Sequence, residues 1–236
     1  MRKPFTRGMT HGLPIALGYF SVSFGFGIVA VQSGLKAIEA VIISLTNLTS
    51  AGQAMGVAII AAGGSLLEMA ATQLVINLRY ALMAISLSQK LDDSFTTPHR
   101  LLAAYGITDE IFAVASAQDC KIVPQYMYGM ISVAALGWVG GTLAGSVANM
   151  LLPATLTAAM GIMLYGMFIA IIVPPAKSSH KVFSVIGVAA VLSCAFKLWL
   201  PSVSTGFAII ISSVVASVIG ALLFPIEPEK SEGIEQ

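Results

Sequence analysis

Long apolar stretches, separated by short polar or proline-containing breaks, run through most of the chain. A helix needs about 20 mostly apolar residues to cross a bilayer. The pattern predicts eight membrane segments, at residues 11–32, 37–62, 66–88, 101–118, 125–150, 154–173, 182–200 and 203–224. Proline, which cannot continue a helix, marks segment ends at Pro153, Pro174, Pro201 and Pro225. The predicted fold is all-α, a polytopic bundle of transmembrane helices.

Polar and small residues interrupt segment 37–62 near its middle. These residues are Asn47, Thr49, Ser50, Gly52 and Gln53. Serine, threonine and asparagine side chains compete for backbone hydrogen bonds, and glycine lowers helix propensity. We expect a break here, with a second half-helix that begins near residue 50. The alternative is a continuous helix whose small residues pack against a neighbouring helix.

A break at this position predicts a binding site. A half-helix that begins inside the protein presents free N–H groups and a partial positive charge, which suit a carboxylate. Broken helices at membrane depth are tolerated where they face protein or a water-filled cavity. In transporters they mark the substrate site. The polar residues of segment 37–62 are therefore candidate substrate-binding residues.

Arg79 lies near the middle of segment 66–88. A charge at that depth costs roughly 2.5–3.5 kcal/mol on insertion scales, so Arg79 is expected to face the interior and to have an acidic partner. Glu68 lies about 16 Å away along the axis, so the partner must come from another segment. The alternative is that Arg79 extends toward the headgroups. Asn77 and Tyr80 share another face of this segment and extend the candidate site.

Segment 101–118 carries two adjacent acids, Asp109 and Glu110, at its centre. Carboxylates in an apolar segment are costly unless they are paired or hydrated. They could pair with Arg79, carry protons or bind a substrate ammonium, and we select them as proton-coupling candidates. The alternative is a surface helix whose acids are solvated.

Composition supports membrane insertion and excludes several classes of protein. Hydrophobic residues make up 57% and charged residues 10% of the 236 residues, and the mean hydropathy is +0.89. Soluble domains carry roughly 25% charged residues. No basic stripe suggests nucleic acid, and Cys120 and Cys194 have no metal-binding spacing. Hydrolase and nucleotide-binding motifs are absent, so we expect no enzyme activity, no cofactor and no metal.

Basic residues orient the predicted bundle, because cytoplasmic loops are rich in lysine and arginine. If all eight segments span, Lys36, Lys90 and Arg100 lie outside. If segments 37–62 and 101–118 are re-entrant, only Lys36 lies outside, which is the better bias. We therefore expect six spans and two broken or re-entrant elements, with eight spans as the alternative. Both versions give a basic cytoplasmic tail at 1–10, a transmembrane domain at 11–225 and an acidic cytoplasmic tail at 226–236.

A short similarity between residues 18–22 (GYFSV) and 129–133 (GMISV) is compatible with an inverted repeat. Inverted repeats are common in transporters.

Several motifs resemble those of one family of membrane proteins. They are GLP at 12–14, FG at 24–25, SAGQ at 50–53, NLRY at 77–80 and TDEIFA at 108–113. Together they resemble the AzlC family, the large subunits of bacterial branched-chain amino acid exporters. The resemblance implies export of branched-chain or related neutral amino acids across the bacterial cytoplasmic membrane, driven by protons. It also implies a small AzlD-type membrane subunit as partner.

The residues and the resemblance together predict a mechanism. The carboxylate of an amino acid meets the half-helix at residues 50–53 with help from Arg79, and its ammonium meets Asp109 or nearby carbonyls. Phe24 contacts the aliphatic side chain, and protonation of Asp109 or Glu110 biases inward against outward states. The alternatives are a scaffold or sensor whose polar groups only hold helices together, and a passive channel.

Overall fold

The computed structural model describes residues 3–225, apart from the side chains of several residues in one helix. The chain forms two compact units that divide after residue 168. The first contains α1 (Pro4–Gln32), α2 (Ala37–Thr46), α3 (Ser50–Ala61), α4 (Leu66–Ser88), α5 (Thr97–Tyr105), α6 (Asp109–Ser116) and α7 (Pro124–Leu151). α8 (Ala154–Ser178) passes from the first unit into the second, which continues with α9 (His180–Trp199) and α10 (Thr205–Leu223).

Five of the described helices are long and apolar enough to cross a membrane: α1, α4, α7, α9 and α10. Their outer surfaces carry many exposed leucines and isoleucines, as expected of helices that face lipid. The prediction of an all-helical polytopic bundle is confirmed. In the second unit α9 and α10 pack together, with Gly220 placed directly against Val185.

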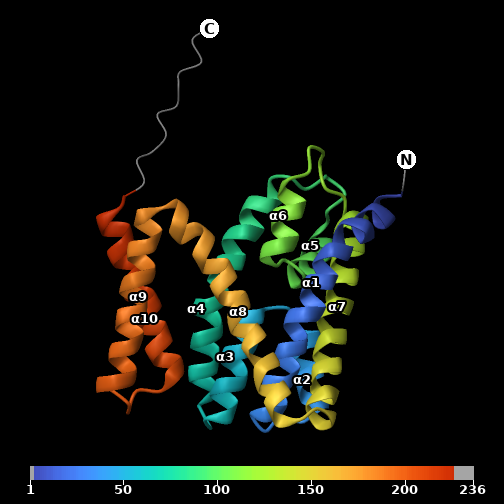
Figure 1. Cartoon of the computed structure of the whole chain (residues 1–236). Coiled ribbons are helices and arrows are strands. Elements are labelled where there is room, and N and C mark those ends of the chain that lie inside the picture. Colours follow the sequence, from blue (N-terminus) through green and yellow to red (C-terminus); the bar gives the residue numbers. More distant parts are fainter. Residues whose placement is uncertain (1–2, 226–236) are drawn as a thin grey trace. The chain divides into compact units, whose positions relative to one another are not determined.

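The first unit is built on α1 and α7, which run side by side in the same direction (Figure 1). Glycines let the two backbones approach closely. A Cβ atom on Gly12 would lie 2.7 Å from the Met130 carbonyl oxygen, so a larger residue would force the helices apart. This contact also explains why α1 begins at Pro4 rather than at residue 11. The predicted basic tail at 1–10 is therefore largely helical, because its residues pack against α7.

α2 and α3 form a re-entrant hairpin in the first unit. α2 starts at the end of the unit where α1 finishes, and α3 returns to that same end, where α4 begins (Figure 1). The chain between them is extended, with φ −146° at Asn47 and φ −114° at Thr49. Gly63, with φ +67° in the left-handed region that favours glycine, turns the chain into α4. The predicted break is confirmed, and the continuous helix is wrong.

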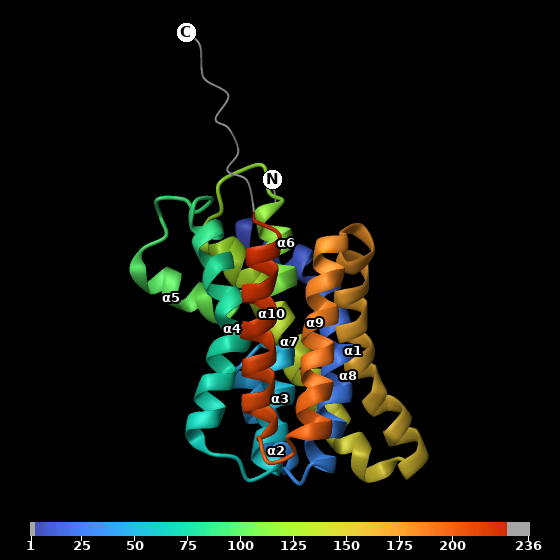
Figure 2. The same cartoon turned by 90° about the vertical axis from the view of Figure 1, so that its left-hand side faces the viewer.

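α5 and α6 form a second hairpin, which enters from the opposite end of the unit (Figure 2). The predicted segment 101–118 is thus two short helices joined at 106–108. The Tyr105 hydroxyl donates to the Leu45 carbonyl oxygen near the C-terminus of α2, so the tips of the two hairpins meet. The expectation of two broken elements is confirmed.

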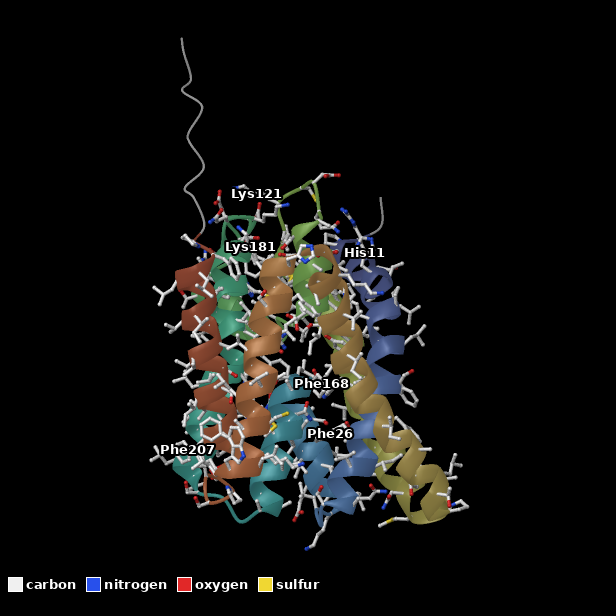
Figure 3. The ribbon with its side chains drawn as sticks, turned by 60° about the vertical axis from the view of Figure 1, so that its left-hand side comes forward. His11, Phe26, Lys121, Phe168, Lys181 and Phe207 are labelled. Atoms are coloured by element: carbon white, nitrogen blue, oxygen red, sulfur yellow. The ribbon has the colours of Figure 1, made fainter. Side chains whose placement is uncertain are left out.

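Two apolar clusters hold the hairpins in place. Leu48, in the break, packs into a core with Ile111 of α6 and Met130 of α7. The other cluster is centred on Phe26 of α1 and includes Val57 of α3, and Phe168 packs against it (Figure 3). Both breaks are therefore fixed by packing on α1 and α7.

Two predicted ends differ from the structure. α8 continues through Pro174 and Pro175 to Ser178, since membrane helices tolerate proline where neighbouring groups satisfy the backbone. α8 is also one continuous helix, unlike α2 and α3, so nothing in it supports the inverted repeat. The acidic tail at 226–236 lies outside the described residues.

Candidate functional site

The break between α2 and α3 creates a helix N-terminus inside the first unit. Thr49 caps it, because its hydroxyl oxygen accepts a hydrogen bond from the Gly52 N–H at 2.9 Å. The first turn of α3 contains no acidic residue. The partial positive charge at this N-terminus is therefore not compensated by the helix itself.

The N-terminus of α6 is arranged differently. Thr108 caps it, and Asp109 and Glu110 occupy its first turn. Negative side chains at this position offset the positive end of a helix. Of the two half-helices, α3 is therefore the one left to attract an anion.

Arg79 of α4 pairs with Asp109 of α6, with 2.8 Å between Nη1 and Oδ2. Arg79 also donates to the Tyr80 hydroxyl at 3.2 Å and lies over the Tyr80 ring. The predicted acidic partner from another segment is confirmed, and extension of Arg79 to the headgroups is wrong. The side chains of Arg79 and Asp109 are 39% and 42% exposed. Exposure of a charged pair near the middle of a spanning helix favours a hydrated face over lipid.

Tyr80 connects this ion pair to the break. Its hydroxyl accepts a hydrogen bond from Arg79 and lies close to Thr49, the cap of α3. The uncompensated N-terminus of α3 and the guanidinium of Arg79 are thus neighbours of the same phenol. The sequence placed these features in separate segments, and the fold brings them together.

Glu110, the second acid, binds Tyr19 of α1. The Tyr19 hydroxyl donates to Glu110 Oε2 at 2.5 Å and lies 2.6 Å from Thr108 Oγ1. Tyr19 is buried. Both acids of α6 are therefore held by partners from other helices, while Glu110 is exposed and the Asp109 side chain is 42% exposed.

Polar side chains on α4 face α3 below the ion pair. Gln73 Nε2 donates to the Gly52 carbonyl oxygen at 2.7 Å, and Asn77 Nδ2 donates to Gln73 Oε1 at 3.0 Å. A carbonyl only accepts, so it fixes the orientation of Gln73 and, through Gln73, that of Asn77. Asn77 Oδ1 is left buried and without a partner among the described residues.

A cavity of about 200 Å³ lies between α2, α3 and α4, beside the break. Its polar lining comes from Thr46, Asn47, Gly52, Gln53 and Gln73, and its apolar lining from Ile43, Gly56, Val57, Ile60 and Met69. Sites for drug-sized ligands span roughly 300–1,000 Å³, so this cavity suits a smaller molecule. Arg79 and Asp109 do not line it, and lie further along the hairpin interface.

Comparison with known proteins identifies the chain at this point. The family model described as AzlC protein matches residues 14–152, more than half of the chain. The chain belongs to the AzlC family.

Two relatives cover most of this AzlC-family chain. An uncharacterized membrane protein of Archaeoglobus fulgidus is 31% identical over 193 residues, which are 80% of this chain and 84% of the relative. The inner membrane protein YgaZ of Escherichia coli is 32% identical over 172 residues, 70% of each chain. No solved structure matches the chain. AzlC-family membership implies a multi-pass membrane transporter for branched-chain amino acids that pairs with an AzlD subunit, and such transporters are generally not enzymes.

The two family motifs at 77–80 and 108–113 contact each other through Arg79 and Asp109. Asn47, Gly52 and Gln53 come together at the cavity, while Thr49 and Ser50 form the start of α3. Phe24 is not brought to this cavity. It lies half-buried on α1, where its carbonyl oxygen faces Gly145 of α7.

Gln53 is 1% exposed and fastens the hairpin to α7. Its Nε2 donates to Ser44 Oγ at 2.8 Å, and its Oε1 accepts from Trp138 Nε1 at 2.7 Å. Ser44 in turn lies 2.7 Å from Thr142 Oγ1. Gln53 therefore holds both legs of the hairpin against one helix of the AzlC bundle.

Sequence reasoning missed Tyr19, Trp138 and the connecting role of Tyr80 in the site. Each is an aromatic residue in an apolar segment, which is an ordinary packing pattern. The available signal was the polar atom of each ring, which needs a partner when buried.

Proposed function

We propose that this AzlC-family chain is the large subunit of a secondary transporter that exports branched-chain or related neutral amino acids across the bacterial cytoplasmic membrane. Proton movement drives export, and a small AzlD-type subunit completes the transporter. Both chain termini face the cytoplasm. The observation that carries the proposal is the uncompensated α3 N-terminus, which lies close to Tyr80, the neighbour of the Arg79–Asp109 pair.

The substrate carboxylate binds at the start of α3. Backbone N–H groups near Ser50 and Gly52 donate to it, and the helix end favours its charge. Arg79 supplies a charge-assisted hydrogen bond when the carboxylate replaces Asp109 as its partner. Binding and release of Asp109 are thereby linked.

The substrate's ammonium and aliphatic side chain bind to other residues of the site. The ammonium donates to Asn77 Oδ1, a buried acceptor without a donor among the described residues. Ile43, Val57 and Ile60 line the apolar side of the cavity and suit a branched aliphatic group. The limited volume favours a small neutral amino acid.

Coupling of transport to protons follows from protonation of Asp109 when the substrate displaces it from Arg79. A carboxylate released from Arg79 at membrane depth is costly as an anion and takes up a proton. The neutral side chain no longer binds α6 to α4, so the hairpins can separate on one side. Deprotonation restores the ion pair. Glu110, held by Tyr19, orients α6 throughout.

Radiolabelled valine counterflow in proteoliposomes tests the proposal, with the chain co-expressed with its small membrane partner. The coupled exporter accumulates label in exchange for internal valine and responds to an imposed pH gradient. A passive channel gives flux that ignores the gradient. A scaffold or sensor gives no flux, and either result contradicts the proposal.

A further inference from the structure

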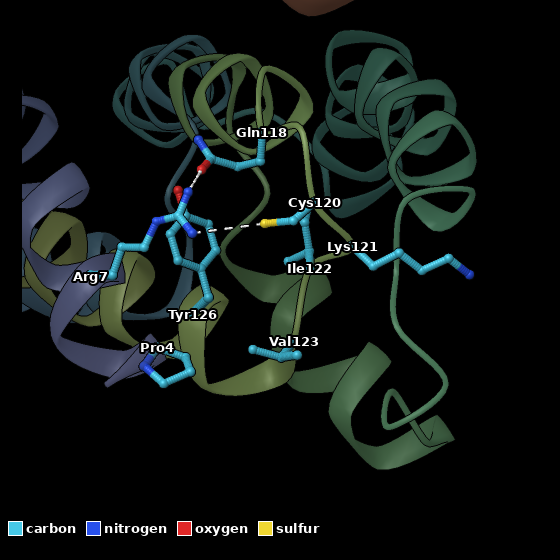
Figure 4. Close-up of a pocket in the computed structure, with 8 residues that line it drawn as sticks. All are labelled: Pro4, Arg7, Gln118, Cys120, Lys121, Ile122, Val123 and Tyr126. Atoms are coloured by element: carbon cyan, nitrogen blue, oxygen red, sulfur yellow. Dashed lines mark hydrogen bonds between the residues drawn. The ribbon is translucent and has the colours of Figure 1, made fainter. Parts of the chain in front are cut away.

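A second cavity, of about 340 Å³, lies where α1 and α7 begin, and Figure 4 shows the residues that line it. Pro4 and Arg7 of α1 form one side, and Tyr126 of α7 forms the floor. The loop that precedes α7 closes it with Lys121, Ile122 and Val123. None of its lining residues belongs to the candidate substrate site.

Helix length places this cavity at the membrane surface. α1 has 29 residues and α7 has 28, which at 1.5 Å per residue makes each roughly 42–44 Å long. The hydrocarbon core of a bilayer is about 30 Å thick. Each helix therefore projects beyond it by roughly 6 Å at either end when centred. The first turns of α1 and α7, which line the cavity, lie at the level of the phosphate headgroups.

The charged residues that line the cavity are Arg7 and Lys121; Asp119 lies in the same loop outside the lining, and Asp92 is close enough to Lys121 to interact with its charge. The Arg7 guanidinium donates to Gln118 Oε1 at 2.5 Å, contacts Cys120 Sγ at 3.8 Å and lies 5.8 Å from the centre of the Tyr126 ring. These partners are neutral, and no lining residue is acidic. Lys121 adds a second positive charge, with its side chain extended away from Arg7 (Figure 4).

The partial positive charges at the N-termini of α1 and α7 are not offset by nearby acidic or capping side chains. α1 and α7 have no acidic residue in the first turn, and Lys3 and Val123 provide no side-chain cap. Proline at the start of each helix removes one N–H, while the remaining free donors of the first turn keep their partial positive charge. The helix ends therefore add to the positive potential of Arg7 and Lys121.

We infer that this cavity binds the phosphate of an anionic phospholipid headgroup. Arg7 presents a planar fork that matches phosphate oxygens, and Lys121 can swing in as a flexible point charge. Pro4, Ile122 and Val123 give the apolar wall that the glycerol end of a lipid requires and a free phosphate does not. The apolar wall and the headgroup-level position together favour a lipid as the source of the phosphate.

Native mass spectrometry of the full chain in detergent tests the inference, with phosphatidylglycerol, phosphatidylcholine and inorganic phosphate as probes. Wild type should retain phosphatidylglycerol over phosphatidylcholine, and Arg7→Gln should weaken phosphatidylglycerol about tenfold, as expected for loss of charge-assisted hydrogen bonds. Lys36→Gln, an exposed lysine before α2, is the matched control and should bind as wild type. Equal binding of the two lipids, or equal loss in both variants, overturns the inference.

A second variant separates binding from loop structure. Gln118→Leu frees the Arg7 guanidinium from its internal partner, so phosphatidylglycerol should bind as tightly as to wild type or more tightly. If binding falls as it does in Arg7→Gln, Arg7 acts by holding the loop and the inference is wrong. Displacement of phosphatidylglycerol by millimolar inorganic phosphate would assign the cavity to free phosphate and contradict the lipid.

Discussion

The Arg79 guanidinium of α4 lies 2.8 Å from the Asp109 carboxylate in the first turn of α6. The pair joins a spanning helix to the tip of a hairpin that enters from one end of the unit. Tyr80, which accepts a hydrogen bond from Arg79, also lies close to Thr49 at the tip of the hairpin from the other end. A change of charge on Arg79 or Asp109 can therefore alter the contacts of both hairpins.

Substitutions of Arg79 and of Asp109 should impair different steps of transport. Arg79→Ala removes the carboxylate partner, and a charge-assisted hydrogen bond is worth about 1.5–3 kcal/mol, so valine counterflow should fall by roughly tenfold to a hundredfold. Asp109→Asn keeps Arg79 but cannot exchange a proton. It should retain valine–valine exchange and lose the response to a pH gradient.

Arg100→Ala is the control for these variants, because Arg100 lies outside the ion pair and donates from Nε to the Phe95 carbonyl oxygen. It should transport as wild type. Unchanged export by Arg79→Ala at normal expression removes Arg79 from the mechanism.

Gly52 and Gly56 lie one turn apart on α3 and should respond oppositely to alanine. A Cβ atom on Gly52 would lie 2.6 Å from Gln73 Oε1 and still closer to Thr49 Oγ1, whereas on Gly56 it would meet nothing nearer than 3.5 Å. Gly52→Ala should displace the Gln73–Asn77 chain and reduce transport several-fold. Gly56→Ala should leave the Gln73–Asn77 chain in place and should stabilise α3 by roughly 0.5–1 kcal/mol; because Gly56 lines the cavity, any loss of transport should be smaller than that of Gly52→Ala.

Transport assays and apparent melting temperatures of both variants check this prediction. Equal transport by the two variants shows that the close approach of α3 and α4 at Gly52 is not required.

The sequence predicted the break, because threonine, asparagine and glycine within an apolar run favour a turn over a continuous helix. It also predicted that Arg79 needs an acidic partner, since charge at membrane depth is costly. It left three roles open for Asp109: ion partner of Arg79, proton carrier and ligand of a substrate ammonium. Choosing among them required the distance between segments that are thirty residues apart, which no local pattern contains.

The start of α1 and the residues that line the cavity beside the break could not be predicted from the sequence for a related reason. A basic N-terminus usually frays, and the close approach of α1 to α7 at Gly8, Gly12 and Gly129 explains why residues 4–10 are helical here. Phe24 has the right chemistry for an aliphatic substrate. Its position on α1, however, places it away from the cavity that Val57 and Ile60 line.

Substitution of Gln53 should lower the stability of the protein more than it lowers the transport rate. Gln53→Leu leaves Trp138 Nε1 without its acceptor, while Ser44 Oγ keeps its hydrogen bond with Thr142 Oγ1. A buried unsatisfied polar group costs about 1–3 kcal/mol. The apparent melting temperature should therefore fall. Trp138→Phe removes the orphaned donor, so the double variant should lose less than the sum of the single losses.

Gln32→Leu, at the exposed end of α1, is the control for this series and should melt as wild type. Strict additivity of the Gln53 and Trp138 variants contradicts the network.

Asn77 should decide whether the substrate must carry an ammonium. Its Oδ1 is a buried acceptor without a described partner, and Gln73 prevents the amide from turning round. An ammonium N–H can satisfy this oxygen, while a keto acid of the same carbon skeleton cannot. Wild type should therefore prefer valine to α-ketoisovalerate as a competitor in counterflow.

Asn77→Leu should lose most of that preference, by about tenfold for a hydrogen bond to a charged group, whereas Asn77→Asp, which keeps an acceptor, should retain it. If Asn77→Leu still transports valine and discriminates as wild type does, the ammonium is bound elsewhere, and Asp109 becomes its acceptor.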